Sequence, residues 1–365
     1  MTTSMRAAVF HGPGDVRIES VPIPTPGPGE VLIQVTSVGV CGTDAHEFDN
    51  GPHQFPIMSA HRASGHIGPM VMGHEFAGRV AGIGDGVDSL REGELVACGA
   101  GVSCGECVNC HRGRTNLCES YWTIGLNGNG GLAEYVVAPA NICFSVEPYG
   151  LSEHKAGLAQ PTSIAVHATR RARVAPEDDV VIIGAGGIGA FLVRAVSSIT
   201  PRVAAIDLSA ERLELATKNG AAWTHQPQPG TDVSDLLAQW GLRPTVVFEV
   251  TGTEAGLASA NEWLEPGARL ILVGLHDGYL PLEYRRTSLI EHELIGTNGH
   301  VAWQDFPRAL ELLSEPGGAW EDIAPEVVPL ESVVEEGLRP IVERNATRIK
   351  TLVDPRVSAI GPAIL

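Results

Sequence analysis

A glycine-rich turn sets the strongest limit on how this chain folds. The segment VVIIGAGGIGA, residues 180–190, places Gly184, Gly186 and Gly189 in the spacing G-x-G-x-x-G, after an apolar run and before a helical pattern. The first glycine permits a tight turn, the second lets the backbone approach a pyrophosphate, and the third lets helix and strand pack closely. The N-terminus of the helix then presents free N–H groups to the phosphates. The segment therefore predicts a strand–turn–helix unit that binds a dinucleotide.

A carboxylate marks the end of the next predicted strand. Asp207 follows the apolar run RVAAI, where its side chain can accept hydrogen bonds from the hydroxyls of an adenosine ribose. The alternative is an ordinary loop carboxylate. Because the negative charge of Asp207 would repel a 2′-phosphate, we expect NAD to be preferred over NADP. The expected cofactor-binding residues are Gly184, Gly186, Gly187, Ile188, Gly189 and Asp207.

The pattern of apolar residues along the chain changes near residue 150. Residues 5–150 are dense in glycine, proline and short alternating apolar runs, which favours a β-rich region with long loops. Later residues alternate strand and helix patterns, which is typical of a parallel α/β sheet. Residues 209–220 predict a helix that Ser209 caps and Gly220 ends. At 365 residues the chain exceeds the usual size of one hydrophobic core, so we expect an α/β protein of two domains.

The net charge and the hydropathy of the chain argue against several classes of binding partner. The formal net charge is -18, which argues against nucleic acids and anionic membrane surfaces. The N-terminal segment lacks the apolar core of a signal peptide, and no stretch offers the roughly 18 uninterrupted apolar residues of a membrane span. We therefore expect a cytoplasmic protein that acts on a small molecule. In that reducing compartment, clustered cysteines are more often metal ligands than disulfides.

Four of the seven cysteines fall within one short segment. In SCGECVNCHRGRTNLC, residues 103–118, the spacing of Cys104, Cys107, Cys110 and Cys118 is C-x2-C-x2-C-x7-C. Four thiolates this close in the chain can close a tetrahedron around zinc. Such an ion has no open position for a substrate, so we interpret the segment as a structural zinc site that fixes a loop.

A catalytic metal would therefore need other ligands. Two segments offer them: VGVCGTDAHEFDN contains Cys41, Thr43, Asp44 and His46, and VMGHEFAG contains His74 and Glu75. A thiolate, an imidazole and a carboxylate would leave one position of a zinc ion open. Taken singly, Cys41 is also explained as a small buried apolar residue, His46 as a solvated loop histidine and Glu75 as a neighbour of the ligands.

Together the motifs resemble one family, the zinc-dependent medium-chain dehydrogenases, which include alcohol, sorbitol and butanediol dehydrogenases. GHEFAGRVAGIGDGV fits the zinc signature of that family, and CGTDAH, the four-cysteine segment, GGLAEYVV and the glycine-rich turn follow in the family's order. The resemblance covers almost the entire chain. The long segment before His74, with Pro56 and Gly65, is similar to the butanediol dehydrogenase branch.

The resemblance implies a GroES-like β-rich catalytic domain, formed by residues 1–155 and 299–365, and a Rossmann NAD-binding domain at 156–298. The segment RIKTLVDP would return to the first domain as a strand. The family implies one catalytic and one structural zinc ion per chain, NAD as cofactor, and a homodimer or homotetramer. Carried over by position, Cys41 and His74 are zinc ligands and Glu75 is a ligand or near-ligand.

The resemblance also assigns roles around the metal. Asp44 would orient His74, while Thr43 and His46 would relay the proton of the alcohol toward solvent. One position departs from the family. The sorbitol and butanediol branches usually have a glutamate before the proline of GLAQPTSIAVHATRR, where this chain has Gln160. A neutral amide is a weaker zinc ligand than a carboxylate, so Gln160 is either a weak direct ligand or a hydrogen-bonding neighbour.

The sequence thus predicts a zinc-dependent oxidoreductase that moves a hydride between NAD and a secondary alcohol, giving the ketone. A vicinal diol or polyol is the expected substrate. The alternatives are a sorbitol-like sugar alcohol, an amino-alcohol such as threonine, or a cyclitol of secondary metabolism. A nucleotide-binding protein with only a structural zinc is the alternative from another class. Phe48, Trp122 and His300 are candidate pocket walls that ordinary packing would also explain.

Overall fold

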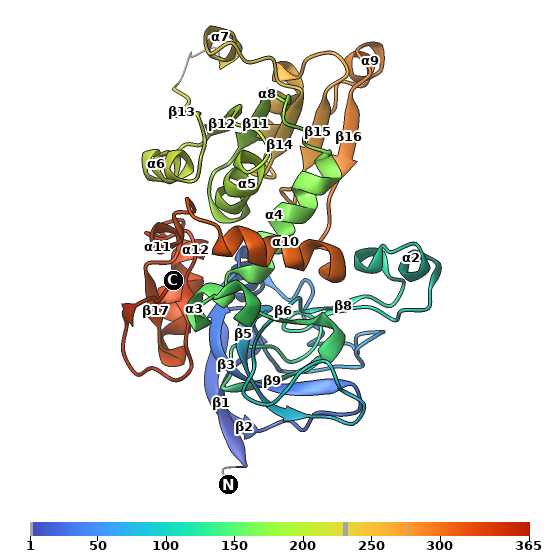
Figure 1. Cartoon of the computed structure of the whole chain (residues 1–365), viewed down its shortest axis with the longest axis vertical. Coiled ribbons are helices and arrows are strands. Elements are labelled where there is room, and N and C mark those ends of the chain that lie inside the picture. Colours follow the sequence, from blue (N-terminus) through green and yellow to red (C-terminus); the bar gives the residue numbers. More distant parts are fainter. Residues whose placement is uncertain (1–2, 229–232, 277) are drawn as a thin grey trace. The chain divides into compact units, whose positions relative to one another are not determined.

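The computed structural model describes residues 3–228, 233–276 and 278–365 and divides into two compact units (Figure 1). Unit 1 contains residues up to Ser163, His300–Ser314 and Trp320–Leu365, and unit 2 contains Ile164–Gly299 and Glu315–Ala319. The predicted domain bounds, 1–155 with 299–365 and 156–298, stay a prediction. Among the described residues, no helix has the length and apolarity needed to span a bilayer.

Unit 1 is the β-rich unit. One sheet has the order β2-β1-β4, a larger one has the order β10-β6-β5-β3-β18-β17-β19 with β9 also paired to β3, and β7 pairs with β8. The strands are β1 (Ser4–Gly12), β2 (Asp15–Pro22), β3 (Glu30–Gly39), β4 (Met70–Val71), β5 (Glu75–Ile83), β6 (Leu95–Cys98), β7 (Gly101–Val102), β8 (Trp122–Thr123), β9 (Tyr135–Pro139), β10 (Cys143–Ser145), β17 (Glu326–Val328), β18 (Leu352–Val353) and β19 (Gly361–Pro362).

Alternation along β3 explains why this segment is a central strand. Val31, Ile33 and Val35 are fully buried in the core of unit 1, as their period of two requires for one face of a sheet. The helices of unit 1 lie in the loops and at the C-terminal end of the chain. They are α1 (Gly42–Asn50), α2 (Val108–His111), α3 (Glu153–Ala156), α10 (Ala302–Ser314), α11 (Trp320–Ile323) and α12 (Arg339–Val342), while α4 (Ala159–Ala172) continues into unit 2.

Unit 2 contains a parallel sheet of order β13-β12-β11-β14-β15-β16, in which strand order reverses between β11 and β14. Ligands of such sheets bind beyond the carboxyl ends of the strands at that reversal. The strands are β11 (Val180–Ile183), β12 (Val203–Ile206), β13 (Trp223–His225), β14 (Val246–Glu249), β15 (Arg269–Leu272) and β16 (Glu293–Gly296); the helices are α5 (Gly187–Ser197), α6 (Ala210–Lys218), α7 (Val233–Gln239), α8 (Glu254–Trp263) and α9 (Tyr284–Leu289).

The expected local elements are confirmed in both units. The side chain of Ser209 accepts a hydrogen bond from the backbone N–H of Arg212 and caps α6. The run RIKTLVDP contains β18, which pairs antiparallel with β3. The last strands therefore return to the β-rich unit, as the sequence predicts.

A buried ionic cluster fixes this returning segment. Asp354, just after β18, is 2% exposed and lies 2.7 Å from Nη2 of Arg356 and 3.2 Å from Nε2 of His154 in α3. Burial acts to raise the pKa of Asp354, but the hydrogen bonds from His154 and Arg356 outweigh it and bring the pKa to about 2. Because the folded pKa lies below the unfolded one, this carboxylate stabilises the fold above about pH 4 and loses that effect as pH falls toward 2.

Asp354→Asn should lower the free energy of unfolding at pH 7 by roughly 1–2 kcal/mol, after allowance for solvent screening. The difference from the wild type should shrink as pH falls from 4 toward 2, because the wild-type carboxylate then takes up a proton. Urea unfolding at pH 7 and pH 3 measures both values, with the exposed Asp88→Asn as control. An equal difference at the two pH values would contradict this role.

Candidate metal centres and coenzyme site

The four-cysteine segment folds back on itself around α2. One sulfur atom from each of Cys104, Cys107, Cys110 and Cys118 lies within 4.8 Å of the other three. The sulfurs of Cys107 and Cys110 are 3.6 Å apart, and those of Cys104 and Cys118 are 3.4 Å apart. Four sulfurs around a zinc ion at about 2.3 Å are separated by about 3.8 Å. The donor set therefore fits a tetrahedral zinc with no open position.

Backbone N–H groups point at these sulfurs. The N–H groups of Cys104 and Ser120 donate to the sulfur of Cys118 at 3.2 and 3.3 Å. N–H groups of Glu119 and Cys110 lower the pKa of Cys107 to about 6, whereas burial and the neighbouring Cys107 raise the pKa of Cys110 to about 12. Several thiols this close favour a cation that lets all of them lose their protons.

A second cluster lies in unit 1, where three residues predicted as ligands come together. Cys41 precedes α1, His74 precedes β5, and Glu75 is the first residue of β5. One donor atom from each lies within 4.8 Å of the others. His74 and Glu75 are 5% and 1% exposed. A half-buried thiol with a buried imidazole and a buried carboxylate is a donor set for a catalytic zinc that keeps one position free.

Glycines make room for this cluster. Gly73 has φ +93°, and a Cβ there would lie 2.8 Å from Leu132. Gly39 is paired with Glu75 across β3 and β5, and a Cβ on Gly39 would lie 2.3 Å from Oε2 of Glu75. The carboxylate of Glu75 therefore occupies the space that a side chain on β3 would fill.

Lys350 holds that carboxylate. Its ammonium group, 5% exposed as a side chain, lies 3.0 Å from Oε1 and 2.7 Å from Oε2 of Glu75 and donates to the carbonyl of Val40 at 3.2 Å. Burial alone would lower the pKa of Lys350, but Glu75 and Cys41 raise it above its ordinary value. Glu75 thus already has a cationic partner on one side, a feature that no local sequence motif marked.

Asp44 connects α1 to the cluster. Its Oδ2 accepts the backbone N–H of Cys41 at 2.9 Å, and its Oδ1 lies 3.5 Å from Nδ1 of His74. Both Oδ1 and Nδ1 are buried and have no closer hydrogen-bond partner among the described residues. Burial alone would lower the pKa of His74, but the nearby Asp44 and Cys41 raise it well above its ordinary value. The carboxylates of Asp44 and Glu75 thus lie beside two nitrogen groups, the ring of His74 and the ammonium of Lys350.

The predicted relay residues lie on the same helix. Thr43 is half-buried, with Oγ1 3.9 Å from the sulfur of Cys41. His46 is exposed and lies three residues further along α1, a spacing that places side chains on one helix face. Thr43 therefore lies near the cluster and His46 at the surface, and their part in a proton relay stays a prediction.

Four other residues of unit 1 were predicted to lie at the site or to line its pocket. Gln160 is the second residue of α4, 9% exposed, and its backbone carbonyl accepts the hydroxyl of Ser163 at 2.6 Å. Its part in metal binding stays a prediction. Phe48 and His300 are buried, and Trp122 is half-buried against the core of unit 1. Phe48 is itself a member of that core, which favours a packing role.

The glycine-rich turn in unit 2 has the geometry that its spacing implies. Gly184 has φ +98°, a conformation that side chains other than glycine rarely adopt. A Cβ on Gly189 would lie 1.9 Å from the carbonyl oxygen of Gly184, so α5 approaches β11 as closely as glycine permits. Gly186 precedes the first turn of α5, where Gly187 and Ile188 follow. Backbone N–H groups there are available to an anion.

Asp207 stands beside this turn. Its Oδ2 accepts the N–H of Ala185 at 2.7 Å and its Oδ1 accepts the N–H of Ser209 at 2.9 Å. A carboxylate has about four acceptor sites, so both oxygens can still receive ribose hydroxyls. Arg212 lies near, with Nη1 3.9 Å from Oδ1 of Asp207. Sequence reasoning missed this cation, although its place in the first turn of α6 marked it as a neighbour of the predicted strand end.

A cavity of about 500 Å³ opens beside Asp207 within unit 2. It contains Gly184 and Arg212 and is further lined by Ile206, Leu208, Thr251, Thr253 and Gly256. Glu249, at the end of β14 and 2% exposed, accepts the N–H groups of Thr251 and Gly252 at 2.8 and 3.0 Å. It thereby fixes the loop that contributes Thr251 to the cavity. No sequence pattern indicated this role, because Glu249 resembles an ordinary strand residue.

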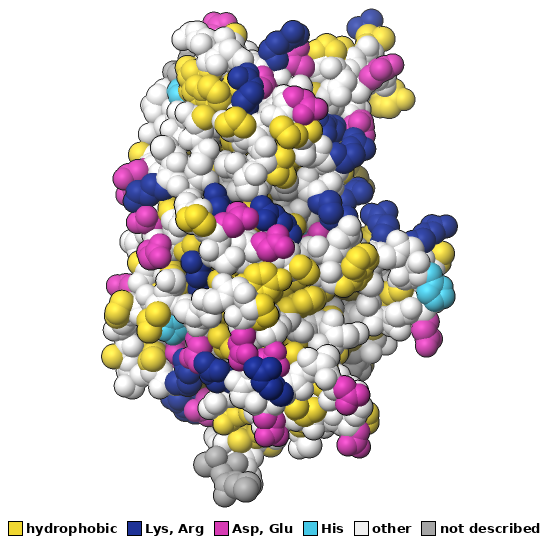
Figure 2. Space-filling view, viewed as in Figure 1, with side chains coloured by type: hydrophobic (Ala, Val, Ile, Leu, Met, Phe, Trp, Pro, Cys, Tyr) yellow, Lys and Arg dark blue, Asp and Glu magenta, His cyan; other side chains and the backbone are white. Residues whose placement is uncertain are grey.

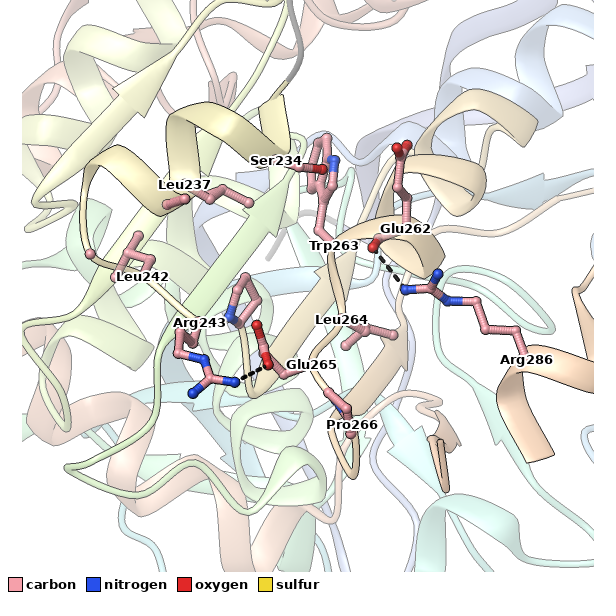
Figure 3. Close-up of a pocket in the computed structure, with 13 residues that line it drawn as sticks. Ser234, Leu237, Leu242, Arg243, Glu262, Trp263, Leu264, Glu265, Pro266 and Arg286 are labelled. Carbon is pink, nitrogen blue, oxygen red and sulfur yellow. Dashed lines mark hydrogen bonds and ion pairs between the residues drawn. The ribbon is translucent and has the colours of Figure 1, made fainter. Parts of the chain in front are cut away.

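Unit 2 has a second cavity, of about 660 Å³ (Figure 3). The segments before β14 and β15 line it, so it lies at the amino ends of these strands. Arg243 and Glu265 form an ion pair of 2.6 Å there, and Arg286 donates to the backbone carbonyl of Glu262 at 3.1 Å. Arg243 thus binds a carboxylate and Arg286 a backbone carbonyl, so both cations already have partners beside this cavity.

Comparisons with known proteins agree with this arrangement. Residues 27–148 match the family model of the alcohol dehydrogenase GroES-like domain, and residues 187–315 match that of the zinc-binding dehydrogenases. The (R,R)-butanediol dehydrogenase of Bacillus subtilis (strain 168) is 28% identical over 354 residues, which cover 96% of this chain and 100% of that protein. Human sorbitol dehydrogenase is 31% identical over 332 residues, 90% of either chain.

Solved structures show the same fold. The crystal structure of 2R,3R-butanediol dehydrogenase from Bacillus subtilis superposes with a TM-score of 0.89 at 29% identity, covering 97% of this chain and 100% of that one. The structure of RspB from Escherichia coli CFT073, complexed with NADH, has a TM-score of 0.86 at 27% identity over 97% and 100% of the two chains. The expected combination of a GroES-like domain and a Rossmann sheet is confirmed.

Cys110→Ser should remove about one zinc ion per chain, because a hydroxyl is a poor zinc ligand beside three thiolates. It should also increase hydrogen exchange across residues 103–118. Elemental analysis and exchange mass spectrometry measure these effects, and Cys143→Ser, outside the cluster, is the matched control. Unchanged zinc content in the Cys110 variant would refute the four-thiolate site.

Proposed function

Since the chain belongs to the zinc-binding alcohol dehydrogenase family, we propose that it oxidises a secondary alcohol to a ketone and passes the hydride to NAD. The observation that carries this proposal is that donor atoms of Cys41, His74 and Glu75 lie within 4.8 Å of one another. This group stands apart from the four-cysteine site, and only an incomplete donor set can take a substrate oxygen as a further ligand. We propose the vicinal diol or polyol class, as in the butanediol and sorbitol dehydrogenases that the chain is similar to.

Zinc bound at Cys41 and His74 would supply a Lewis acid that lowers the pKa of the alcohol. Nδ1 of His74 faces Asp44, which leaves Nε2 as the nitrogen for the metal and keeps the ring in position. The hydroxyl of Thr43 then accepts the proton of the alcohol and passes it toward His46, which is exposed to solvent. Loss of that proton makes departure of the hydride favourable.

Glu75 balances charge at this site. Because Lys350 binds both of its oxygens, Glu75 would have to give up part of that ion pair to coordinate a metal. We therefore propose that Glu75 lies next to the metal as a near-ligand while Lys350 binds its carboxylate. Gln160 is the other candidate for the third zinc ligand. A neutral third ligand leaves more positive charge on the zinc than a carboxylate would.

In unit 2, the carboxylate of Asp207 would bind the ribose hydroxyls of NAD, and Gly184, Gly186, Gly187, Ile188 and Gly189 would surround the pyrophosphate. Arg212 adds a positive charge at the edge of the same cavity. We propose that Asp207 makes the enzyme prefer NAD, because the 2′-phosphate of NADP would lie against the carboxylate of Asp207. Since two thiolate-based sites need reduced cysteines, we also propose that the enzyme works in the cytoplasm.

The zinc-loaded enzyme should reduce NAD, followed as NADH absorbance, with at least one member of a panel of 2,3-butanediol, sorbitol, threonine and a cyclitol. kcat/KM should favour NAD over NADP by at least about tenfold, equivalent to about 1.4 kcal/mol. Asp207→Ala should reduce that preference, because Arg212 then faces a 2′-phosphate without the opposing carboxylate. Failure with every alcohol and both coenzymes would refute the proposed reaction.

We further propose that the chain forms a homodimer or homotetramer through the edge of its parallel sheet. β16 pairs only with β15 in the described part of the chain, so its other edge offers unpaired backbone groups. Leu294 in β16 is 39% exposed, and Tyr284 and Leu289 of α9 are 79% and 66% exposed. Apolar side chains are visible over α9 on the face shown in Figure 2. An edge of this kind pairs readily with its own copy about a twofold axis.

Leu294→Lys should lower the native mass measured by light scattering toward that of a smaller assembly, because a lysine on an edge strand opposes pairing. Ile199→Lys, which alters a side chain of similar exposure, 38%, should leave the mass unchanged. An unchanged mass for the Leu294 variant, or a monomeric wild type, would contradict the proposed contact.

A further inference from the structure

Two cysteines outside both metal clusters lie opposite each other in the large sheet of unit 1. Cys98 is the last residue of β6 and Cys143 is the first residue of β10, and the antiparallel register pairs them directly. They are 1% and 8% exposed, and both are free thiols. Neither the proposed reaction nor the zinc sites use them.

The backbone around the pair favours a bond between the sulfurs. The N–H of Gly99 donates to the carbonyl of Ile142 at 2.8 Å, and the N–H of Val146 donates to the carbonyl of Leu95 at 3.0 Å. These bonds place Cys98 and Cys143 at a position between hydrogen-bonded pairs, where opposing Cα atoms are about 4.5 Å apart. A disulfide accepts Cα separations of about 4.4–6.8 Å, so the bond requires no large shift of either strand.

The two sulfurs have different surroundings. The sulfur of Cys98 accepts the N–H of Ala100 at 3.3 Å, and the sulfur of Cys143 donates to the carbonyl of Pro139 at 3.4 Å. Ala100 has φ +57°, an uncommon conformation for alanine that directs its N–H at the sulfur of Cys98. The sulfur of Cys98 therefore receives a hydrogen bond while the sulfur of Cys143 gives one, and this difference assigns the first attack on an oxidant to Cys98.

We propose that Cys98 and Cys143 are a redox pair that forms an intramolecular disulfide when the enzyme meets hydrogen peroxide. The sulfur of Cys98 attacks one oxygen of the peroxide, the O–O bond breaks, and the departing hydroxide takes the proton of the Cys98 thiol, so that a sulfenic acid and one water form. The sulfur of Cys143 then attacks the sulfenic sulfur, giving the S–S bond and a second water. Overall two thiols lose two electrons and two protons, and one peroxide is reduced to two waters.

The position of the pair suggests what the bond does. The loop that it closes contains Cys104, Cys107, Cys110 and Cys118, so the whole four-cysteine segment lies inside it. Cys98 is followed by the residues that lead into that segment, and β10 is the edge strand of its sheet. A disulfide there would hold β10 to β6 when peroxide also attacks the zinc thiolates, and would limit unfolding of the unit.

The test uses the intact zinc-loaded enzyme, treated with hydrogen peroxide, alkylated, and digested with trypsin and a glutamate-specific protease. Cleavage after Glu94, Glu106 and Glu134 separates Cys143 from every other cysteine and leaves Cys98 with only Cys104. We expect a linked peptide pair, lighter than the sum of its reduced halves by two hydrogens, whose fragments place the bond at Cys98 and Cys143. Dithiothreitol should restore both free thiols.

Cys143→Ala is the matched variant. It should lose the linked peptide, accumulate oxidised Cys98, and keep the activity of the untreated wild type. Oxidation should raise Tm of the wild type relative to the oxidised variant, because the crosslink restricts the unfolded chain. Alkylation of both Cys98 and Cys143 after the four zinc cysteines have oxidised, or recovery of either as a sulfinic acid without the crosslink, would overturn the proposal whatever the stability of the variant.

Discussion

The buried ion pair between Glu75 and Lys350 organises the metal cluster of unit 1. Their atoms are separated by 275 residues in the chain and by 2.7 Å in the fold. Removing one partner of a buried ion pair costs several kcal/mol, of the order of 3–5, so Glu75 depends on the C-terminal segment that brings Lys350 beside it. Gly39 beneath the carboxylate completes the arrangement. Cys41 and His74 take their positions from the same strands.

In the proposed function, one cysteine-containing site stabilises the fold and the other carries the reaction. The four-thiolate segment uses every coordination position of its ion, so it can fix a loop but cannot bind a substrate. The group at Cys41 is an incomplete donor set, and its Cys41 lies next to Thr43, which can exchange a proton. The difference in completeness, and not the number of cysteines, locates the chemistry.

Local patterns carried most of what the sequence could predict. The glycine turn and the four cysteines are encoded by short spacings, and the Rossmann sheet and the cap at Ser209 follow from periodicity and local hydrogen bonding. Lys350, Arg212 and Glu249 were missed, because their partners are set by strand order and by the return of the C-terminal segment. The pairing of Cys98 with Cys143 likewise depends on the register of β6 and β10, which no short stretch of sequence encodes.

The central claim is that one chain holds a closed structural zinc and an open catalytic one. Zinc content per folded chain, measured for the wild type and for Cys41→Ser, tests it most directly. The account predicts about two zinc ions in the wild type and about one in the variant, with the circular dichroism spectrum kept and alcohol oxidation lost. A single zinc in the active wild type, or two in the variant, would contradict it.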